Sequence, residues 1–156
     1  MPDDLTYFED LVVGSIQKFG RYEVSREEVL DFALKYDPQP FHLDDEAAAA
    51  THFGRLSASG WHTCAMMMAM MVENLKHNRQ AGLGSPGQDE LRWHHPVYPR
   101  DVLRVETELL EKTRSRSRPE MGSMRSRIRV FNQDDRLVMS LTGIGLIAVR
   151  NPDRSD

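Results

Sequence analysis

The stretch YDPQPFHLD, residues 36–44, places an acid and a histidine on a segment that two prolines stiffen. Asp37 and His42 are five positions apart, and the ordinary pKa values of the two side-chain types differ by about 2.6 pH units. General acid–base catalysis needs such groups held rigidly within reach of one water molecule. Alternatively, the stretch is a stiff turn in which Asp37 caps a helix and His42 packs its ring. Spacing alone leaves both interpretations open.

Ser59 and Gly60 form a second candidate, at the predicted start of a long helix. A helix N-terminus presents free amide donors and the positive end of the helix dipole. Because glycine lacks a Cβ, a ligand carbonyl could approach Gly60 closely, as an enolate-like oxyanion requires. The plainer interpretation is an N-cap serine followed by a tight entry into the helix.

The elements before the Asp37–His42 stretch can be predicted from pattern. Residues 17–24 contain enough β-formers for a first strand. Ser25 and Glu28 are spaced as a capping box, which predicts a helix over roughly residues 26–36. That helix must end before Pro38, because the residue before a proline avoids the α region.

A second, longer helix is predicted from Ser59 to about His77, since this segment has no proline. Its middle is apolar on every side, which indicates a helix that is buried all round. Between the two long helices, Asp44 or Asp45 is expected to cap a short helix that Gly54 closes.

Four strand-like stretches follow in the second half of the chain, and residues 132–135 between the last two form a hairpin signal. A sheet long enough to wrap one buried helix predicts an α+β hotdog fold. Its open sheet edges predict a homodimer or a dimer-based oligomer. The four stretches are residues 91–97, 101–113, 122–133 and 136–149.

Composition indicates one globular domain over residues 1–156, with a core at about 10–150. The chain is 40% hydrophobic and 28% charged, and its formal net charge of -4 argues against nucleic-acid binding. The single cysteine, Cys64, fits a reducing cytoplasm. The acidic N-terminus does not resemble a signal peptide, and the longest apolar run, residues 64–72, is too short to span a membrane.

Other candidate residues carry weaker signals. His62 is expected to be a packed polar residue, and His94 and His95 lack neighbours at metal-site spacing, so no metal is predicted. The methionine run 66–71 is typical of core filling. A set of arginines could either contact substrate phosphates or form a solvated strand face; these are Arg114, Arg116, Arg118, Arg125, Arg127 and Arg129.

The opening stretch resembles the D-x-N-P-(apolar)-H-x-D motif of the MaoC-like dehydratases and (R)-specific enoyl-CoA hydratases, with Gln39 in place of the usual Asn. The segment 56–61 is similar to the apolar-small-His-Gly segment of that family, with Ser59 in the His place. Residues 93–101 resemble its W-x-x-P-V-x-P-G-D stretch, with Arg100 where Gly is usual. The residues on the first motif are Asp37, Pro40, Phe41, His42 and Asp44.

The resemblance implies a hotdog fold and reversible syn addition of water to a trans-2-enoyl-CoA thioester. Asp37 and His42 would position and deprotonate the water, in roles that the sequence does not separate, and the Gly60 amide would polarise the thioester carbonyl. No metal or organic cofactor is expected, because the thioester activates the substrate. The resemblance also implies substrate contacts from Gln39, Pro40, Phe41, Ser59 and Trp61.

Two other functions remain open from the sequence. A hotdog thioesterase would need a carboxylate near the start of the long helix, but Glu73 is the only one within it and lies about four turns from Gly60. A non-catalytic acyl-CoA-binding subunit is the third interpretation, although both Asp37 and His42 are present. At Arg100 the backbone is expected to avoid a conformation that only glycine adopts readily.

Overall fold

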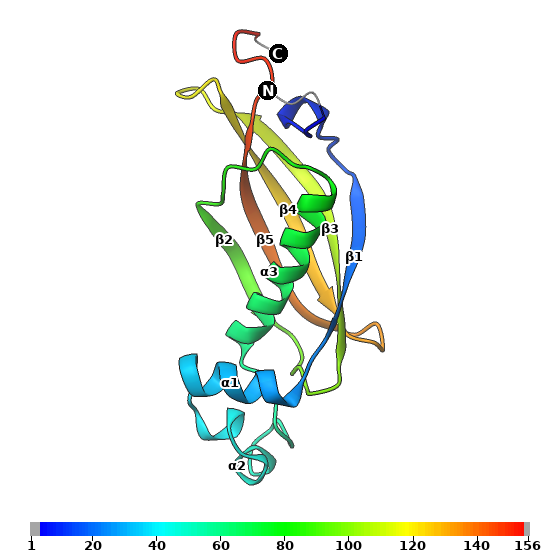
Figure 1. Ribbon diagram of the computed structural model, residues 1–156, viewed down its shortest axis with the longest axis vertical. Coiled ribbons are helices and arrows are strands. Elements are labelled where there is room, and N and C mark those ends of the chain that lie inside the picture. The colour runs from blue at the N-terminus through cyan, green and yellow to red at the C-terminus, as the bar shows by residue number, and fades with distance from the viewer. Residues whose placement is uncertain (1–3, 155–156) are drawn as a thin grey trace.

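A five-stranded antiparallel sheet wraps one side of a single long helix (Figure 1). The structure, a computed structural model, describes residues 4–154. The long helix α3 spans Gly60–His77, and the predicted hotdog fold is confirmed. No helix within the described range is long and apolar enough to cross a membrane. The strands are β1 (Ile16–Glu23), β2 (Gly87–Trp93), β3 (Val102–Arg114), β4 (Met121–Phe131) and β5 (Leu137–Ala148).

The order of the strands across the sheet is β1-β3-β4-β5-β2. β3 and β4 alternate inward apolar and outward charged side chains, and they pair over most of their length. The predicted hairpin joins β4 to β5, where the Asn132 side chain accepts hydrogen bonds from the amides of Asp134 and Arg136. β1 and β2 are the sheet edges.

Three short elements lie together beyond the N-terminal end of α3, while the first and last described segments of the chain lie at the opposite end (Figure 1). α1 spans Arg26–Tyr36, η2 spans Pro40–His42 and α2 spans Asp45–Ala49. A further 3-10 turn, η1, spans Phe8–Asp10. This arrangement carries the Asp37–His42 loop to the amide end of α3.

The helix α3 is not buried all round, contrary to the sequence prediction. Met66, Met67 and Met70 pack against the inner face of the sheet, but Trp61 is 59% exposed and Met68 48% exposed. The sheet covers only one side of the helix, so residues at helical spacing on the other side face outward.

Three local predictions also need correction. β2 begins at Gly87 rather than Leu91, because an edge strand tolerates polar residues that resemble a loop in the sequence. The Ser25 hydroxyl accepts a hydrogen bond from the Glu28 amide, but the Glu28 carboxylate contacts Tyr22 and His62 instead of completing a capping box. The helix capped by Asp44 ends at Ala49, before Gly54.

Arg100 adopts a φ of 77°, so the expectation that its backbone avoids the glycine-favoured region was wrong. Its amide donates to the Val24 carbonyl at 2.7 Å, which fixes the turn. We expect Arg100→Gly to raise the free energy of unfolding by about 0.5–1 kcal/mol, because glycine adopts left-handed backbone without strain. Urea unfolding measures the change. Arg116 is an exposed loop residue whose φ is not positive, so Arg116→Gly should not raise the free energy of unfolding. Equal changes in stability at both positions would contradict the explanation.

Candidate active site

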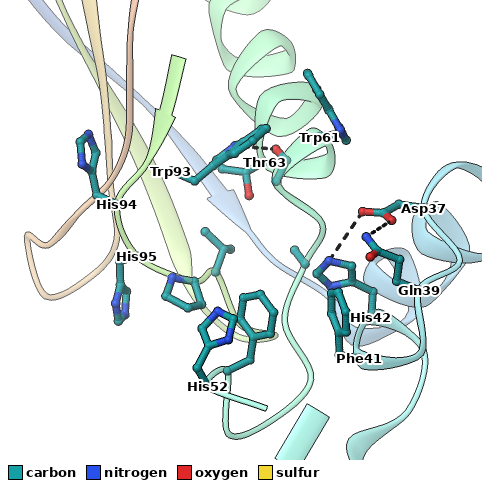
Figure 2. Close-up of a pocket in the computed structure, with 15 residues that line it drawn as sticks. Asp37, Gln39, Phe41, His42, His52, Trp61, Thr63, Trp93, His94 and His95 are labelled. Atoms are coloured by element: carbon teal, nitrogen blue, oxygen red, sulfur yellow. Dashed lines mark hydrogen bonds and ion pairs between the residues drawn. The ribbon is translucent and has the colours of Figure 1, made fainter. Parts of the chain in front are cut away.

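The loop after α1 brings the Asp37 and His42 side chains together (Figure 2). Asp37 is the C-cap residue of α1, and its amide donates to the Ala33 carbonyl at 2.9 Å. Pro40 then opens η2, which turns the chain back, so that Nε2 of His42 lies 3.6 Å from Oδ2 of Asp37. The gap is longer than a direct hydrogen bond and leaves both atoms available to a common water molecule.

The His42 ring is held in one tautomer. It is only 5% exposed, and its Nδ1 lies 2.8 Å from the Ser57 carbonyl oxygen. Because a carbonyl can only accept, Nδ1 carries the proton and donates it. In the neutral ring, Nε2 is then an unprotonated acceptor that faces Asp37. Phe41 and Phe53 pack around the imidazole and fix its orientation.

The Asp37 carboxylate accepts one hydrogen bond on each oxygen. The Gln39 side-chain amide donates to Oδ1 at 2.7 Å, and the Ser59 hydroxyl donates to Oδ2 at 2.7 Å. Burial raises the pKa of Asp37, but these two hydrogen bonds, with the positive charge of His42 in its protonated form, outweigh burial and lower that pKa below its ordinary value. Asp37 is therefore an anion near neutral pH.

Gln39 and Ser59 both hold the Asp37 carboxylate, and Gln39 also lines the cavity, while substrate contact by either residue stays a prediction. Ser59 is fully buried and does not line the cavity. Its hydroxyl also accepts a hydrogen bond from the Trp61 amide and so caps α3. Two of the three residues that depart from the family-like segments, Gln39 and Ser59, thus converge on one side chain, Asp37.

A cavity of about 480 Å³ opens beside this pair. One wall comes from the Asp37–His42 loop, and the facing wall comes from the end of β2 and the segment after it (Figure 2). Gly60, Trp61 and Thr63 of α3 complete the lining, so the first turn of α3 lies between the walls. The other lining residues are Gln39, Phe41, His52, Phe53, Ala58, Trp93, His94, His95, Pro96 and Val97.

Several of these residues were not predicted as site residues. The wall from Trp93 to Val97 lies more than fifty positions after His42 in the chain, so no local spacing connects the two. The resemblance of residues 93–101 to a family segment could have indicated that this wall belongs to the site. Pro40, the first residue of η2, shapes the loop and is not among the residues that line the cavity, and its substrate contact stays a prediction.

Gly60 lacks a Cβ for a different reason from the one predicted. A Cβ built there would lie 2.4 Å from the Trp93 ring, so the indole occupies the space that was expected to admit a ligand. Trp93 Nε1 donates to the Gly60 carbonyl at 3.0 Å. The Gly60 amide remains one of the first-turn donors of α3, which lack partners within the helix.

The remaining histidines do not form a metal site. His94 hydrogen-bonds to Ser140, while His95 turns to the other side (Figure 2). Across residues 4–154, no three His, Cys, Asp or Glu side chains gather as metal ligands would. His62 is buried, stacks on Phe32 and contacts Glu28, as expected for a packed polar residue.

Removing the Ser59 hydroxyl should move the acid limb of the pH–rate profile to higher pH. Activity that needs the Asp37 anion is lost as the pH falls through the lowered pKa of that group. In Ser59→Ala, burial still raises the pKa and one opposing hydrogen bond is gone. The loss then begins at a higher pH, and kcat/KM measured against pH reports the change.

Gln39→Ala is the matched variant, because it removes the other hydrogen bond to Asp37 and keeps the α3 cap. The acid limb should move in the same direction. Only Ser59→Ala should also lose about 1 kcal/mol of unfolding free energy through the lost cap. An acid limb that stays in place in both variants would contradict the assigned role.

Comparison with known proteins places these features in a family. Residues 12–129 match the MaoC like domain. The 3-hydroxybutyryl-CoA dehydratase of Methylorubrum extorquens is 31% identical over 74% of this chain and 71% of its own. The MaoC-like dehydratase structure from Rhodospirillum rubrum is 38% identical, with a TM-score of 0.84 over 93% of this chain and 98% of that chain.

A hydratase structure is also similar. R-hydratase PhaJ1 from Pseudomonas aeruginosa superposes with a TM-score of 0.67 at 26% identity, over 96% of this chain and 92% of that chain. The family match covers well over half of the sequence, and it includes the Asp37–His42 loop, the first turn of α3 and the wall after β2. The chain therefore belongs to the family of MaoC-like domains.

Proposed function

We propose that the protein hydrates trans-2-enoyl-CoA thioesters reversibly to 3-hydroxyacyl-CoA. The observation that carries the proposal is the pair of proton acceptors, His42 Nε2 and Asp37 Oδ2, 3.6 Å apart on the wall of a cavity that also includes Gly60. The relative from Methylorubrum extorquens, a 3-hydroxybutyryl-CoA dehydratase, supports the same reaction class.

The two acceptors fit a water molecule that donates one proton to each. This orientation turns the oxygen lone pair toward a substrate Cβ on the same side of the cavity. As the C–O bond forms, His42 Nε2 takes a proton from the water and becomes an imidazolium. The Asp37 anion, which the Ser59 and Gln39 hydrogen bonds keep ionised, stabilises that charge.

The electrons of the double bond move toward the thioester oxygen during this step. The Gly60 amide, at the positive end of α3, stabilises the developing oxyanion. The His42 imidazolium then returns its proton to Cα, which restores the neutral ring and completes the addition of one water. His42 serves as base and then as acid, while Asp37 orients the water, and no separate cofactor takes part in the proposed cycle.

A panel of acyl-CoA substrates tests the proposal. Loss of the conjugated thioester absorbance reports hydration of enoyl-CoA, and a thiol reagent reports release of CoA from saturated acyl-CoA. Hydration without thiol release is the expected result. Thiol release would instead favour the thioesterase alternative, although Glu73 is exposed and lies about 20 Å along α3 from Gly60. Binding of every panel member without turnover would favour a non-catalytic subunit.

We also propose that the protein is a homodimer, formed through the outward face of α3 and the edge strand β2. Trp61, Ala65, Met68 and Ala69 lie on one exposed apolar face of the helix, and an unpaired strand edge needs a partner. Met68→Glu should convert dimer to monomer in light scattering, because it buries a charge in the interface. Val12→Glu, at an exposed apolar residue elsewhere, is the control; a monomeric parent protein would contradict the proposal.

A further inference from the structure

A strip of basic and aromatic side chains runs along the rim of the cavity; we name Arg55, Tyr98, His95 and Arg136 the rim strip. The Arg55 guanidinium lies 3.9 Å from the centre of the Tyr98 ring. The Tyr98 ring meets the His95 ring edge-on at 6.2 Å, and His95 lines the cavity. The amides of His94 and His95 donate to the Val138 carbonyl at 2.8 and 3.4 Å, which places Arg136, two residues before Val138, beside His95. Burial and the charge of Arg136 lower the pKa of His95. The four residues are therefore successive neighbours along the rim of the cavity.

The two arginines of the rim strip differ from those on the outer face of the sheet. Outer-face Arg125, Arg127 and Arg129 form ion pairs with carboxylates of the neighbouring strand β3, and Arg125 also with Asp89 of β2. For these three of the six arginines considered from the sequence, the ion pairs favour the solvated strand face, because their charges are already compensated. Within residues 4–154, no carboxylate pairs with Arg55 or Arg136, and both side chains are exposed.

Asp101, in the turn beside Tyr98, is already engaged by hydrogen bonds. The charge of Asp101 raises the pKa of His95, whereas the charge of Arg136 lowers it. Asp101 is buried, and its oxygens accept hydrogen bonds from the Tyr98 amide at 2.9 Å and the Gln133 side chain at 3.0 Å. Asp101 thus holds the turn in place, and the two guanidinium groups remain available to an anion from solution.

The volume of the cavity indicates which anion the two guanidinium groups bind. A volume of about 480 Å³ suits an acyl group and its thioester. The remainder of a CoA-like carrier must therefore leave the cavity across its rim. Guanidinium groups bind phosphate through paired hydrogen bonds, and stacking on Tyr98 pre-orients that of Arg55.

We propose that Arg55 and Arg136 bind the phosphate groups at the far end of the pantetheine arm of the substrate. The inference rests on the proposed function, since it assumes a thioester in the cavity. The phosphate chemistry has two sources, the pyrophosphate of CoA and the phosphodiester that links pantetheine to an acyl carrier protein. Both place an anion beyond the same thiol-bearing arm.

Steady-state kinetics of the Arg55→Gln/Arg136→Gln double variant test the proposal. Glutamine keeps much of the side-chain stem and removes the charge. With crotonyl-CoA, KM should rise about tenfold or more while kcat stays unchanged, because the lost contacts lie away from the reacting atoms. With the crotonyl thioester of N-acetylcysteamine, which has no phosphate, the variant and the parent should be equal. Arg127→Gln on the outer face is the matched control and should change neither KM.

Crotonyl-loaded acyl carrier protein separates the two phosphate sources. A raised KM for crotonyl-CoA, for the carrier protein or for both supports the rim strip and identifies the source. An unchanged KM for both overturns the inference. If the parent protein hydrates neither crotonyl-CoA nor the truncated thioester, the proposed function fails instead. Calorimetry with CoA itself then still tests the strip, because loss of CoA binding in the double variant supports it and equal binding overturns it.

Discussion

Replacing His42 with alanine lowers kcat for enoyl-CoA hydration by about 10²–10⁴-fold in the proposed mechanism. The variant loses the Nε2 acceptor that takes the proton from water, and the other side chains on Asp37, Gln39 and Ser59, are hydrogen-bond donors to it and do not replace that acceptor. Asp37→Asn should have a loss of similar size, because an amide neither orients the water as an anion does nor stabilises the imidazolium. Initial rates at the conjugated thioester absorbance measure both.

The fold should survive both substitutions. His42→Ala leaves the Ser57 carbonyl without its donor, which costs about 1–3 kcal/mol of unfolding free energy, so circular dichroism and thermal unfolding must accompany the kinetics. His77→Ala is the control, since His77 is exposed at the far end of α3. Full activity in folded His42→Ala or Asp37→Asn protein would remove the pair from the mechanism.

Gly60→Ala is the second substitution with a large expected effect. The new Cβ would lie 2.4 Å from Trp93, so the indole must move and its hydrogen bond to the Gly60 carbonyl breaks. Overpacking of this kind costs about 1–3 kcal/mol of unfolding free energy. Displacement of the amide donor should lower kcat by about 10²–10³-fold, as loss of an oxyanion donor does elsewhere. Chemical denaturation and steady-state kinetics measure the two effects.

A second substitution separates the clash from the amide. In Gly60→Ala/Trp93→Ala the ring is absent and the alanine amide can return to its place, so part of the lost activity should return. Gly82→Ala is the matched control, because a Cβ there has no heavy atom within 4 Å and Gly82 has ordinary backbone angles. A Gly60→Ala protein with parental stability and activity would contradict the role given to the first turn of α3.

Most of the fold could be predicted from local pattern. Ser25 and Pro38 bound α1, and Ser59 marks the start of α3, because caps and prolines act within a few residues. β2 was misplaced, since its polar edge residues carry no alternation, and its position is set by pairing with β5. The exposed face of α3 was missed for a similar reason: an apolar sequence does not show which of its residues the sheet covers.

The site was predictable only where the residues are close in sequence. Asp37 and His42 lie on one short loop, so their spacing and the family motif indicated them together. The contacts of Ser59 with Asp37 and of Trp93 with Gly60 join residues 22 and 33 positions apart. These contacts depend on how the loop and β2 pack against the start of α3, which residue type does not encode. The pairing of Arg125, Arg127 and Arg129 likewise depends on strand register.

Hydration of crotonyl-CoA in deuterium oxide tests the central claim most directly. Because Nε2 of His42 and Oδ2 of Asp37 lie 3.6 Å apart on one wall, the hydroxyl and the deuteron should reach the same face of the double bond. Proton NMR of the 3-hydroxybutyryl product reports their relative configuration through the coupling between Cα and Cβ protons. The proposed mechanism predicts a single syn-deuterated product. An anti product, or free CoA with no hydroxyacyl product, would contradict it.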